Sequence, residues 1–468
     1  MAQSPSVAMP IRFPMVESLN NRSTLSNLDS RMINAYGEMV SEGDYWVYKR
    51  PGLSALYTNV TGDARGMWHW LGDIYMVAGT TFYKNGTALA TVDGANGSYR
   101  FNQSKGGTPR LFLMNGSYAF TYDGSAFAQV TDGNYPTSLV KGAAYLNGTM
   151  YVMDSAGIIR GSDLNDPTSW PVLNSITAQI ESDQGVALAQ QNTFIVAFKG
   201  WSTEFFWDAG NATGSPLSPN LPAKLNWGCA SAESVQEIDG ELFWVAANKS
   251  ASLTVMKMVN TQPTRVSNKA IEKILNNVGG PAITHSWTFR GFGHRFYAIT
   301  STSAGTGIGT GFTLVLDIDE GLWAYWTDAS YNYFPIAATT FGNTTVALMQ
   351  HMTNGNVYEV DNVFTSDAGA IIPVDIYTPN ADLNTRRKKM ISMLEFIGDQ
   401  TSGSTLSVSC SDDDYATFSA ARTVDLSKAR PQLDKCGTFS RRAYRLHHES
   451  DTAFHMKAIE MQIDIGTL

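Results

Sequence analysis

A short pattern of polar and hydrophobic positions recurs along the first three-quarters of the chain. Each copy has a tight turn of Gly, Asn or Asp followed by a short run with a large apolar or aromatic centre, as in a β-hairpin. The copies are LGDIYMVA (71–78), MNGSYAFTYDG (114–124), LNGTMYVMDS (146–155), QQNTFIVAF (190–198), IDGELFWVA (238–246), GHRFYAIT (293–300) and FGNTTVALM (341–349).

The copies follow one another at roughly 30 to 55 residues, which is the spacing of β-propeller blades. Other short alternating runs flank each copy, so that four strands per repeat are available. Because one small sheet cannot bury both of its faces, such sheets pack face to face around an axis. We therefore predict an all-β fold with a β-propeller of about six or seven blades over residues 46–370. Neither a WD nor a kelch signature is present, and two stacked sandwiches are the alternative.

The pattern differs at both ends of the predicted propeller. Residues 1–45 have no clear period and predict an extended N-terminal arm that packs on another element, such as a neighbouring subunit. From residue 371 the runs are longer, and residues 371–468 predict a C-terminal antiparallel β-sandwich. A single helix is predicted over 267–280, with Ser267 or Asn268 as its cap and Gly279 as its end.

Composition supports a β-rich globular protein, with 43% hydrophobic and only 16% charged residues. The net charge is −9, and the acidity is uneven. Residues 371–468 hold 12 Lys and Arg against 13 Asp and Glu, which leaves 21 against 29 for the first 370. Cys229, Cys410 and Cys436 are few and far apart, so we expect reduced thiols. Neither a signal peptide nor a membrane anchor is expected.

Candidate chemistry is sparse. GTGIGTG (305–311) lacks the helix and the Gly-Lys-Ser/Thr of a phosphate loop, which favours a flexible hairpin. SCSDDDYATF (409–418) resembles the structural Asp-box turn of sialidases without its Gly, and its three carboxylates leave Ca²⁺ binding open. The histidines are scattered without zinc spacing. We predict no catalytic residue, no cofactor and no metal, although paired carboxylates for glycoside hydrolysis depend on tertiary distances.

Four consecutive cations stand out against the acidic chain: Arg386, Arg387, Lys388 and Lys389. We expect them to enter a strand at the start of the C-terminal sandwich, where alternation sends Arg386 and Lys388 to one face and the other two to the opposite face. Three interpretations remain open: a charged strand edge that discourages aggregation, contact with an acidic surface of a neighbouring subunit or adaptor, and direct DNA binding. We treat the four residues as a candidate assembly interface.

Several stretches, taken in order, resemble one family, the packaged-DNA stabilization proteins of short-tailed bacteriophages, also called tail hub or nozzle proteins. The resemblance touches most of the chain from about residue 30, but it does not extend to the loop 301–311 or to the basic cluster. The stretches are INAYGEMV (33–40), YWVYKRPGL (45–53), ARGMWHWLGDIYMVAGTTFYKNG (64–86), QIESDQGVALAQQNTFIVAFKGWSTEFFWDAGN (179–211), NKAIEKIL (268–275), RRAYRLHHES (441–450) and KAIEMQIDI (457–465).

The resemblance implies a structural virion protein of the tail, made in the host cytoplasm and without enzymatic activity. It implies a homo-oligomeric ring, expected to be six-fold, below the portal and its adaptor, in contact with a tail needle or plug and with fibres or spikes. The ring would retain packaged DNA and form the channel for its ejection. A larger tubular nozzle protein of another phage group would differ mainly in its neighbours.

The charge distribution is compatible with a DNA conduit. Phosphate contacts summed over a ring would hold the duplex, whereas an acidic wall lets it slide. We therefore expect acidic side chains of residues 46–370 to line the channel. The alternative function is a carbohydrate-binding or depolymerising tail-associated β-propeller, for which the 11 Trp and 20 Tyr could stack on sugars, although blade cores also bury aromatic rings.

Overall fold

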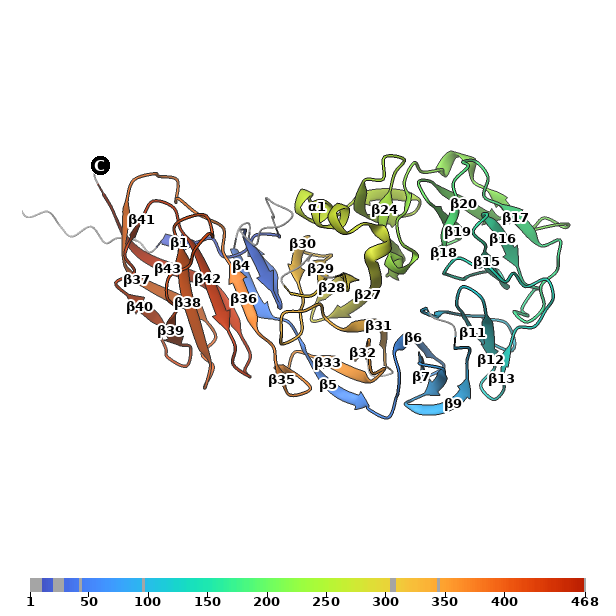
Figure 1. Cartoon of the computed structure of the whole chain (residues 1–468), viewed down its shortest axis with the longest axis horizontal. Coiled ribbons are helices and arrows are strands. Elements are labelled where there is room, and N and C mark those ends of the chain that lie inside the picture. Colours follow the sequence, from blue (N-terminus) through green and yellow to red (C-terminus); the bar gives the residue numbers. More distant parts are fainter. Residues whose placement is uncertain are drawn as a thin grey trace, which may run out of the picture.

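The computed structural model describes residues 11–19, 29–41, 44–94, 97–303, 309–342 and 346–466. These residues are almost entirely β-structure, with one α-helix and three short 3-10 helices: η1 (Leu221–Ala223), η2 (Ala232–Ser234) and η3 (Gly280–Ala282). Figure 1 shows an elongated molecule, with a ring of small sheets at one end and larger sheets at the other.

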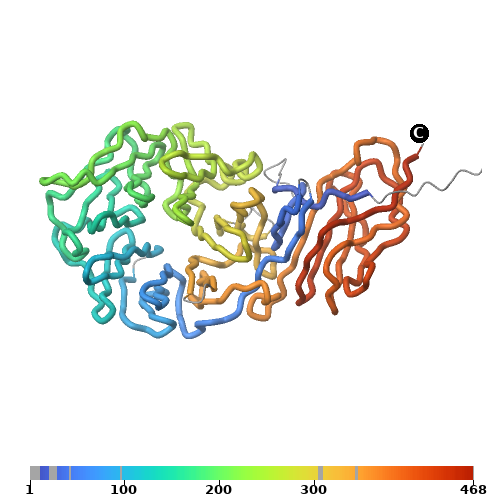
Figure 2. The backbone as a smooth tube through the Cα atoms, turned by 180° about the vertical axis from the view of Figure 1, so that it is seen from behind, coloured from blue at the N-terminus to red at the C-terminus, as the bar shows by residue number. Residues whose placement is uncertain are grey.

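The ring is a β-propeller. Six of its blades are separate sheets, and the remaining place is taken by β27–β30, one end of a nine-stranded sheet. We call each of these seven units a sector. The chain forms the sectors in sequence order around a common centre (Figure 2), as expected for a propeller. The prediction of a propeller with about six or seven blades is confirmed.

The strands of the first four sectors are β6 (Ala64–Trp70), β7 (Asp73–Ala78), β8 (Thr81–Lys84) and β9 (Thr87–Thr91); β10 (Arg100–Gln103), β11 (Leu111–Met114), β12 (Ala119–Tyr122) and β13 (Phe127–Gln129); β14 (Ala144–Leu146), β15 (Thr149–Met153), β16 (Ile158–Gly161) and β17 (Ser175–Thr177); and β18 (Gly185–Gln191), β19 (Phe194–Lys199), β20 (Thr203–Asp208) and β21 (Leu217–Pro219).

The other three sectors contain β22 (Gly228–Cys229), β23 (Gln236–Ile238), β24 (Glu241–Ala247), β25 (Leu253–Val259) and β26 (Gln262–Arg265); β27 (Ile283–Gly291), β28 (His294–Ser301), β29 (Phe312–Asp317) and β30 (Leu322–Tyr325); and β31 (Ile336–Phe341), β32 (Ala347–His351), β33 (Val357–Asp361), β5 (Gly52–Tyr57), β34 (Ser366–Asp367) and β35 (Ala370–Ile371).

The recurring sequence pattern marks one hairpin per sector. In six of the seven copies the apolar run is the second strand from the centre; in MNGSYAFTYDG it is the third, β12, because LFLM already forms β11. The turn chemistry is also as expected at Asn85–Gly86 and Asn147–Gly148, where both residues have positive φ angles, as type I′ turns require.

Neighbouring sectors are held together by apolar side chains from their facing surfaces. One buried cluster lies between each adjacent pair. Phe198 of β19 and Trp244 of β24, for example, place their ring centres 5.1 Å apart across one such boundary. Since each aromatic side chain of this size stabilises the fold by about 1.5–3 kcal/mol when buried, the clusters account for the face-to-face stacking.

The ring is closed by a strand that precedes the first sector. β5 pairs antiparallel with β33 of the last sector, with Leu53 opposite Val360. The adjoining Arg50 is 1% exposed and forms a bidentate ion pair with Asp367, at 2.9 and 2.6 Å. Its Nε donates to Asn34 Oδ1 at 2.9 Å. This one side chain therefore links Asn34, which precedes the propeller, to the last sector of the ring.

Two larger sheets lie beside the propeller. The nine-stranded sheet continues from β30 through β2 (Arg31–Ile33), β36 (Val374–Tyr377), β42 (Ala443–His448), β38 (Thr405–Ser411) and β39 (Arg422–Asp425). The seven-stranded sheet contains β3 (Ala35–Ser41), β4 (Asp44–Lys49), β43 (His455–Ile465), β37 (Lys389–Gly398) and β40 (Gln432–Asp434), with β1 (Ile11–Phe13) on β43 and β41 (Thr438–Phe439) on β37.

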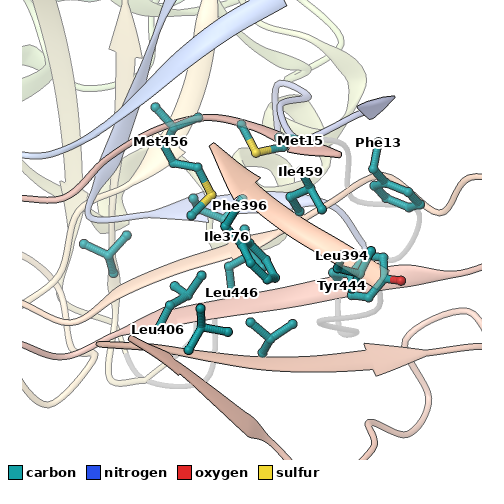
Figure 3. Packing of buried hydrophobic residues seen from close by; sticks show 14 of the residues in the cluster. Phe13, Met15, Ile376, Leu394, Phe396, Leu406, Tyr444, Leu446, Met456 and Ile459 are labelled. Atoms are coloured by element: carbon teal, nitrogen blue, oxygen red, sulfur yellow. The ribbon is translucent and has the colours of Figure 1, made fainter. Parts of the chain in front are cut away.

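One apolar cluster joins the two larger sheets. Leu394 and Ile459 of the seven-stranded sheet pack with Leu406 and Leu446 of the nine-stranded sheet, and Phe13 of β1 covers one end (Figure 3). All five side chains are at most 2% exposed. The strands expected after residue 371 are present, but strands from before residue 50 complete both sheets.

The N-terminal segment is described for residues 11–19 and 29–41, and it contributes strands to the two larger sheets. Its described strands pair within the same chain: β1 with β43, β2 with β30 and β36, and β3 with β4. Asn34 is fully buried and donates to Thr327 Oγ1 and to the Pro373 carbonyl. The sequence does not predict β1 and β2, because each has only three residues and therefore shows no period of hydrophobic positions.

The one predicted helix is present as α1 (Lys269–Val278). The Asn268 side chain caps it by accepting from the Ile271 amide at 3.0 Å, and the helix ends at Gly279, which has a φ of 80°. No helix among the described residues has the length and hydrophobicity needed to cross a bilayer.

Candidate functional site

A cavity lies among the innermost strands of the propeller. Every sector contributes residues from or next to its innermost strand to a cavity of about 660 Å³. The lining is mixed, with backbone from all seven sectors and charged side chains at a few positions. These charged or titratable residues are Arg65, His69, Arg100, Lys141, Glu233, Glu237 and His285.

A network of charges crosses this cavity and centres on Glu233. Its carboxylate forms an ion pair with Lys141 and another with Arg100, whose Nη2 lies 3.1 Å from Oε2. Ser98 Oγ donates to the same carboxylate at 2.9 Å. The Glu233 backbone amide donates to Ser231 Oγ, which fixes the short turn η2. The three charged side chains come from three sectors, so the network braces the ring from inside.

The electrostatics of the network keep Glu233 ionised. Burial alone would raise the pKa of Glu233, but the positive charges of Arg100 and Lys141 and their hydrogen bonds lower it below its usual value. Burial lowers the pKa of the nearby His285, so that its ring is neutral at pH 7. A general acid for glycoside hydrolysis needs a raised carboxyl pKa, and Glu233 has the opposite shift.

The basic cluster lies mostly in a loop. Arg386, Arg387 and Lys388 precede β37 and are exposed, and only Lys389 enters the strand. The expectation that all four cations enter a strand and alternate between its faces is therefore wrong for the first three, because the Asp382–Thr385 turn before them delays pairing.

Lys389 also differs from its neighbours in environment. It is fully buried, and its Nζ donates to the carbonyls of Thr385 and Arg387 at 2.6 and 2.9 Å. Its ammonium lies 5.2 Å from the centre of the Phe439 ring. Burial lowers the pKa of Lys389. Lys389 thus shapes the loop, and the three exposed cations are what the loop presents to solvent.

The Asp-rich hairpin after β38 sends its three carboxylates in different directions. Asp412 forms a bidentate pair with Arg442, at 2.7 and 2.8 Å, and Asp414 contacts Arg441. Asp413 accepts hydrogen bonds from Ser411 and Thr417, and these lower its pKa to about 2. The open Ca²⁺ interpretation is therefore not supported, and no metal-binding group of His, Cys, Asp or Glu is found in the described ranges.

The described part of the glycine-rich stretch 305–311 agrees with the predicted hairpin connection. Residues 304–308 lie outside the described part of the chain, and the flanking β28 and β29 are paired antiparallel. Gly311 has a φ of 69°, and a Cβ there would lie 2.3 Å from the Ser301 carbonyl. A tight strand connection explains this glycine.

Two features could not be predicted from the sequence: the Glu233 network, and the ion pair between Arg50 and Asp367, which we call the Arg50 clamp. Glu233 lies 92 residues from Lys141 along the chain, and Arg50 lies 317 residues from Asp367. No local motif joins partners this far apart. The stretch YWVYKRPGL contains Arg50. The Arg50 side chain is buried because closure of the ring brings Asp367 and Thr327 against it.

None of the curated proteins compared with the chain matches it. Similar solved structures include "Streptogramin B lyase structure" (9% identity, 67% of this chain and 98% of that chain, TM-score 0.43) and "Structure of U3-55K" (10%, 66% and 98%, TM-score 0.41). A third is "Crystal Structure of the N-terminal Domain of Nup159" (11%, 71% and 99%, TM-score 0.37). With TM-scores below 0.5, they carry no inference about function.

A family model is more informative, because it covers more than half of the chain. The model described as "Bacteriophage P22 Gp10, beta-propeller" matches residues 13–289. The match begins in β1 and ends in β27, so it includes Arg50, five complete sectors and the Glu233 network. The chain therefore belongs to the family of bacteriophage P22 Gp10, the phage DNA-stabilization proteins that form structural parts of the tail.

Proposed function

We propose that this protein is a tail hub or nozzle subunit that assembles into a ring, six-fold by expectation, below the portal and adaptor. The ring retains the packaged DNA and forms the channel through which it is ejected. The observation that carries this proposal is the family match over residues 13–289. In the virion tail the ring would contact the adaptor, a needle or plug, and fibres or spikes.

The role proposed here is mechanical and not enzymatic. The Glu233 carboxylate at the propeller axis is engaged by two cations and has a lowered pKa, which argues against acid catalysis there. Aromatic side chains mostly serve the core: Trp170, Trp244, Trp287, Trp323 and Trp326 are at most 1% exposed. Nothing specific favours a carbohydrate-binding or depolymerising function.

We further propose that double-stranded DNA passes through the centre of the ring of subunits and not through the propeller axis. The axial cavity of about 660 Å³ is crossed by the Glu233 network, and a duplex is far wider than such a hollow. Acidic side chains of residues 46–370 would line the ring channel and keep the duplex sliding. A ring structure with a mainly basic lumen would contradict this part of the proposal.

We propose that the three predicted parts of the chain have different roles in the assembled tail. Residues 46–370 form the body of the ring. Residues 371–468, which contribute strands to both larger sheets, attach the ring to neighbouring proteins together with the N-terminal segment 1–45. The single apolar cluster between the sheets supports treating them as one unit.

Electron microscopy of the purified protein and of virions would test this function. We expect a ring with a central channel in the purified sample, and the same ring below the portal in virions. Particles lacking the protein should package DNA and then lose it, which nuclease protection measures. A monomeric protein that digests capsular polysaccharide would overturn the proposal.

A further inference from the structure

We propose that the loop Thr385–Lys388 of one subunit docks on the acidic outer end of the sectors β14–β17 and β18–β21 of the next copy of the chain. We call the first surface the basic loop and the second the acidic end. The proposal rests on the proposed ring and deepens it, because it names the two surfaces through which copies meet.

The basic loop presents positive charge that is not paired with any of the described residues. Arg386, Arg387 and Lys388 are exposed, and their side chains form no ion pair with the described residues. Two other exposed arginines near these sheets are engaged, Arg430 by Glu395 at 2.6 Å and Arg441 by Asp414 at 3.2 Å. Met390, next to the loop, is 49% exposed. Three free cations beside an apolar side chain are suited to a complementary surface.

The acidic end has the opposite charge. Between residues 144 and 219 the chain has two basic residues, Arg160 and Lys199, and seven acidic ones, Asp154, Asp163, Asp166, Glu181, Asp183, Glu204 and Asp208. Lys199 is buried with Asp183 and Glu204, and Glu181 pairs with Lys224 and Lys249. The remaining excess therefore rests on the other four aspartates.

Exposed apolar side chains belong to the same two sectors or follow them directly. Leu164 is 70% exposed, Leu221 63% and Trp207 45%. Trp207, Asp208 and Asn220, the neighbour of Leu221, line one hollow of about 530 Å³ at this end. Exposed leucines and a tryptophan within an acidic rim resemble the centre of a binding surface, where large apolar groups contribute most of the binding energy.

The two surfaces lie at opposite ends of the elongated molecule. Lys389 at the end of the basic loop is paired with Ile465 beside the C-terminus, which Figure 2 places at the outer end of the larger sheets. The sectors β14–β17 and β18–β21 lie at the far end of the ring (Figure 1). Two different patches on one chain give a head-to-tail contact, which forms a closed ring when the rotation between copies is suitable.

Charge-swap variants and sedimentation velocity would test the contact. Reversal of the basic loop (Arg386→Glu, Arg387→Glu, Lys388→Glu) should weaken self-association of the full chain by about tenfold or more, because it places like charges together. Asp163→Lys with Leu164→Lys should have a similar effect from the other side. A chain with both sets of changes should regain association, since its charges are again complementary.

Controls separate this contact from general charge effects and from the proposed function. Lys428→Glu with Lys435→Glu, on exposed positions of the same sheets, should leave association unchanged. If the loop-reversal variant still forms rings like those of the wild type, the proposed interface is wrong but the proposed ring stands. A monomeric wild type would overturn both. If loop reversal abolishes binding of a 30-base-pair duplex in fluorescence polarisation while rings remain intact, the loop binds DNA and the contact is disproved.

Discussion

Arg50 joins the N-terminal segment to the last sector of the propeller. It is buried, its guanidinium forms a bidentate pair with Asp367, and it lies 4.3 Å from the centre of the Phe334 ring. Removing one partner of a buried pair leaves the other charge without compensation, which costs about 3–5 kcal/mol.

We expect Arg50→Met to lower the free energy of unfolding by about 3–5 kcal/mol, measured by urea denaturation with tryptophan fluorescence. Arg12→Met is the matched control, because Arg12 pairs with Asp44 and Glu460 at the surface, where such pairs contribute about 0–1 kcal/mol. Equal losses in the two variants would contradict the role of Arg50 as a clamp.

Glu233 should make stability depend on acid. The pKa of Glu233 is lower in the folded protein than its usual value of 4.5, so the stabilisation is complete above about pH 4.5 and is lost as the pH falls through the folded pKa. We expect Glu233→Gln to be less stable than the wild type at pH 7 and to lose less stability between pH 4.5 and pH 3. Thermal melts across this range would show the difference, and parallel curves would contradict it.

At the scale of elements, the closure strand β5 depends on a glycine that fits closely against backbone. A Cβ at Gly52 would lie 2.5 Å from the carbonyl oxygens of Phe364 and Ser366. Both contacts are with backbone, so relief requires β5 or the 364–366 segment to move.

We expect Gly52→Ala to cost about 1–3 kcal/mol, as overpacking does, and to lower the melting temperature in differential scanning calorimetry. Gly133→Ala should be neutral, because a Cβ there meets nothing within 4 Å and its φ is not positive. A Gly52→Ala protein as stable as the wild type would mean that β5 closes the ring more loosely than described.

Elements with a strong local signal could be predicted from the sequence. The apolar hairpins, the Asn147–Gly148 turn and the capped helix α1 follow from periods and caps that lie within a few residues. β2 could not be predicted, since its three residues gain their strand pairing only between β30 and β36. The basic loop was wrongly predicted to be a strand, because the sequence does not show where pairing with a distant strand begins. Pairing with β43 begins only at Lys389.

At the scale of the whole molecule, the predicted boundaries at residues 45 and 370 cut through continuous structure. β2 lies between β30 of the propeller and β36 of the larger sheets in one nine-stranded sheet. We therefore expect a fragment of residues 46–370 to be less stable than the full chain, because it exposes the edge of β30 and removes Asn34 from Arg50. Limited proteolysis of fragment and full chain would measure this. A fragment as resistant as the full chain would show that the propeller is autonomous.

The pairing of the first described strand with the last has a consequence for synthesis of the protein. β1 lies along β43, with Ile11 opposite Met461, and the ring itself is closed by a strand that was made before any sector. In a growing chain β5 and β2 therefore find partners only once β33, β30 and β36 have been made, and β1 only once β43 has been made. Chains that end prematurely would keep those edges open, so the fold itself provides a completeness check before subunits can be built into a particle.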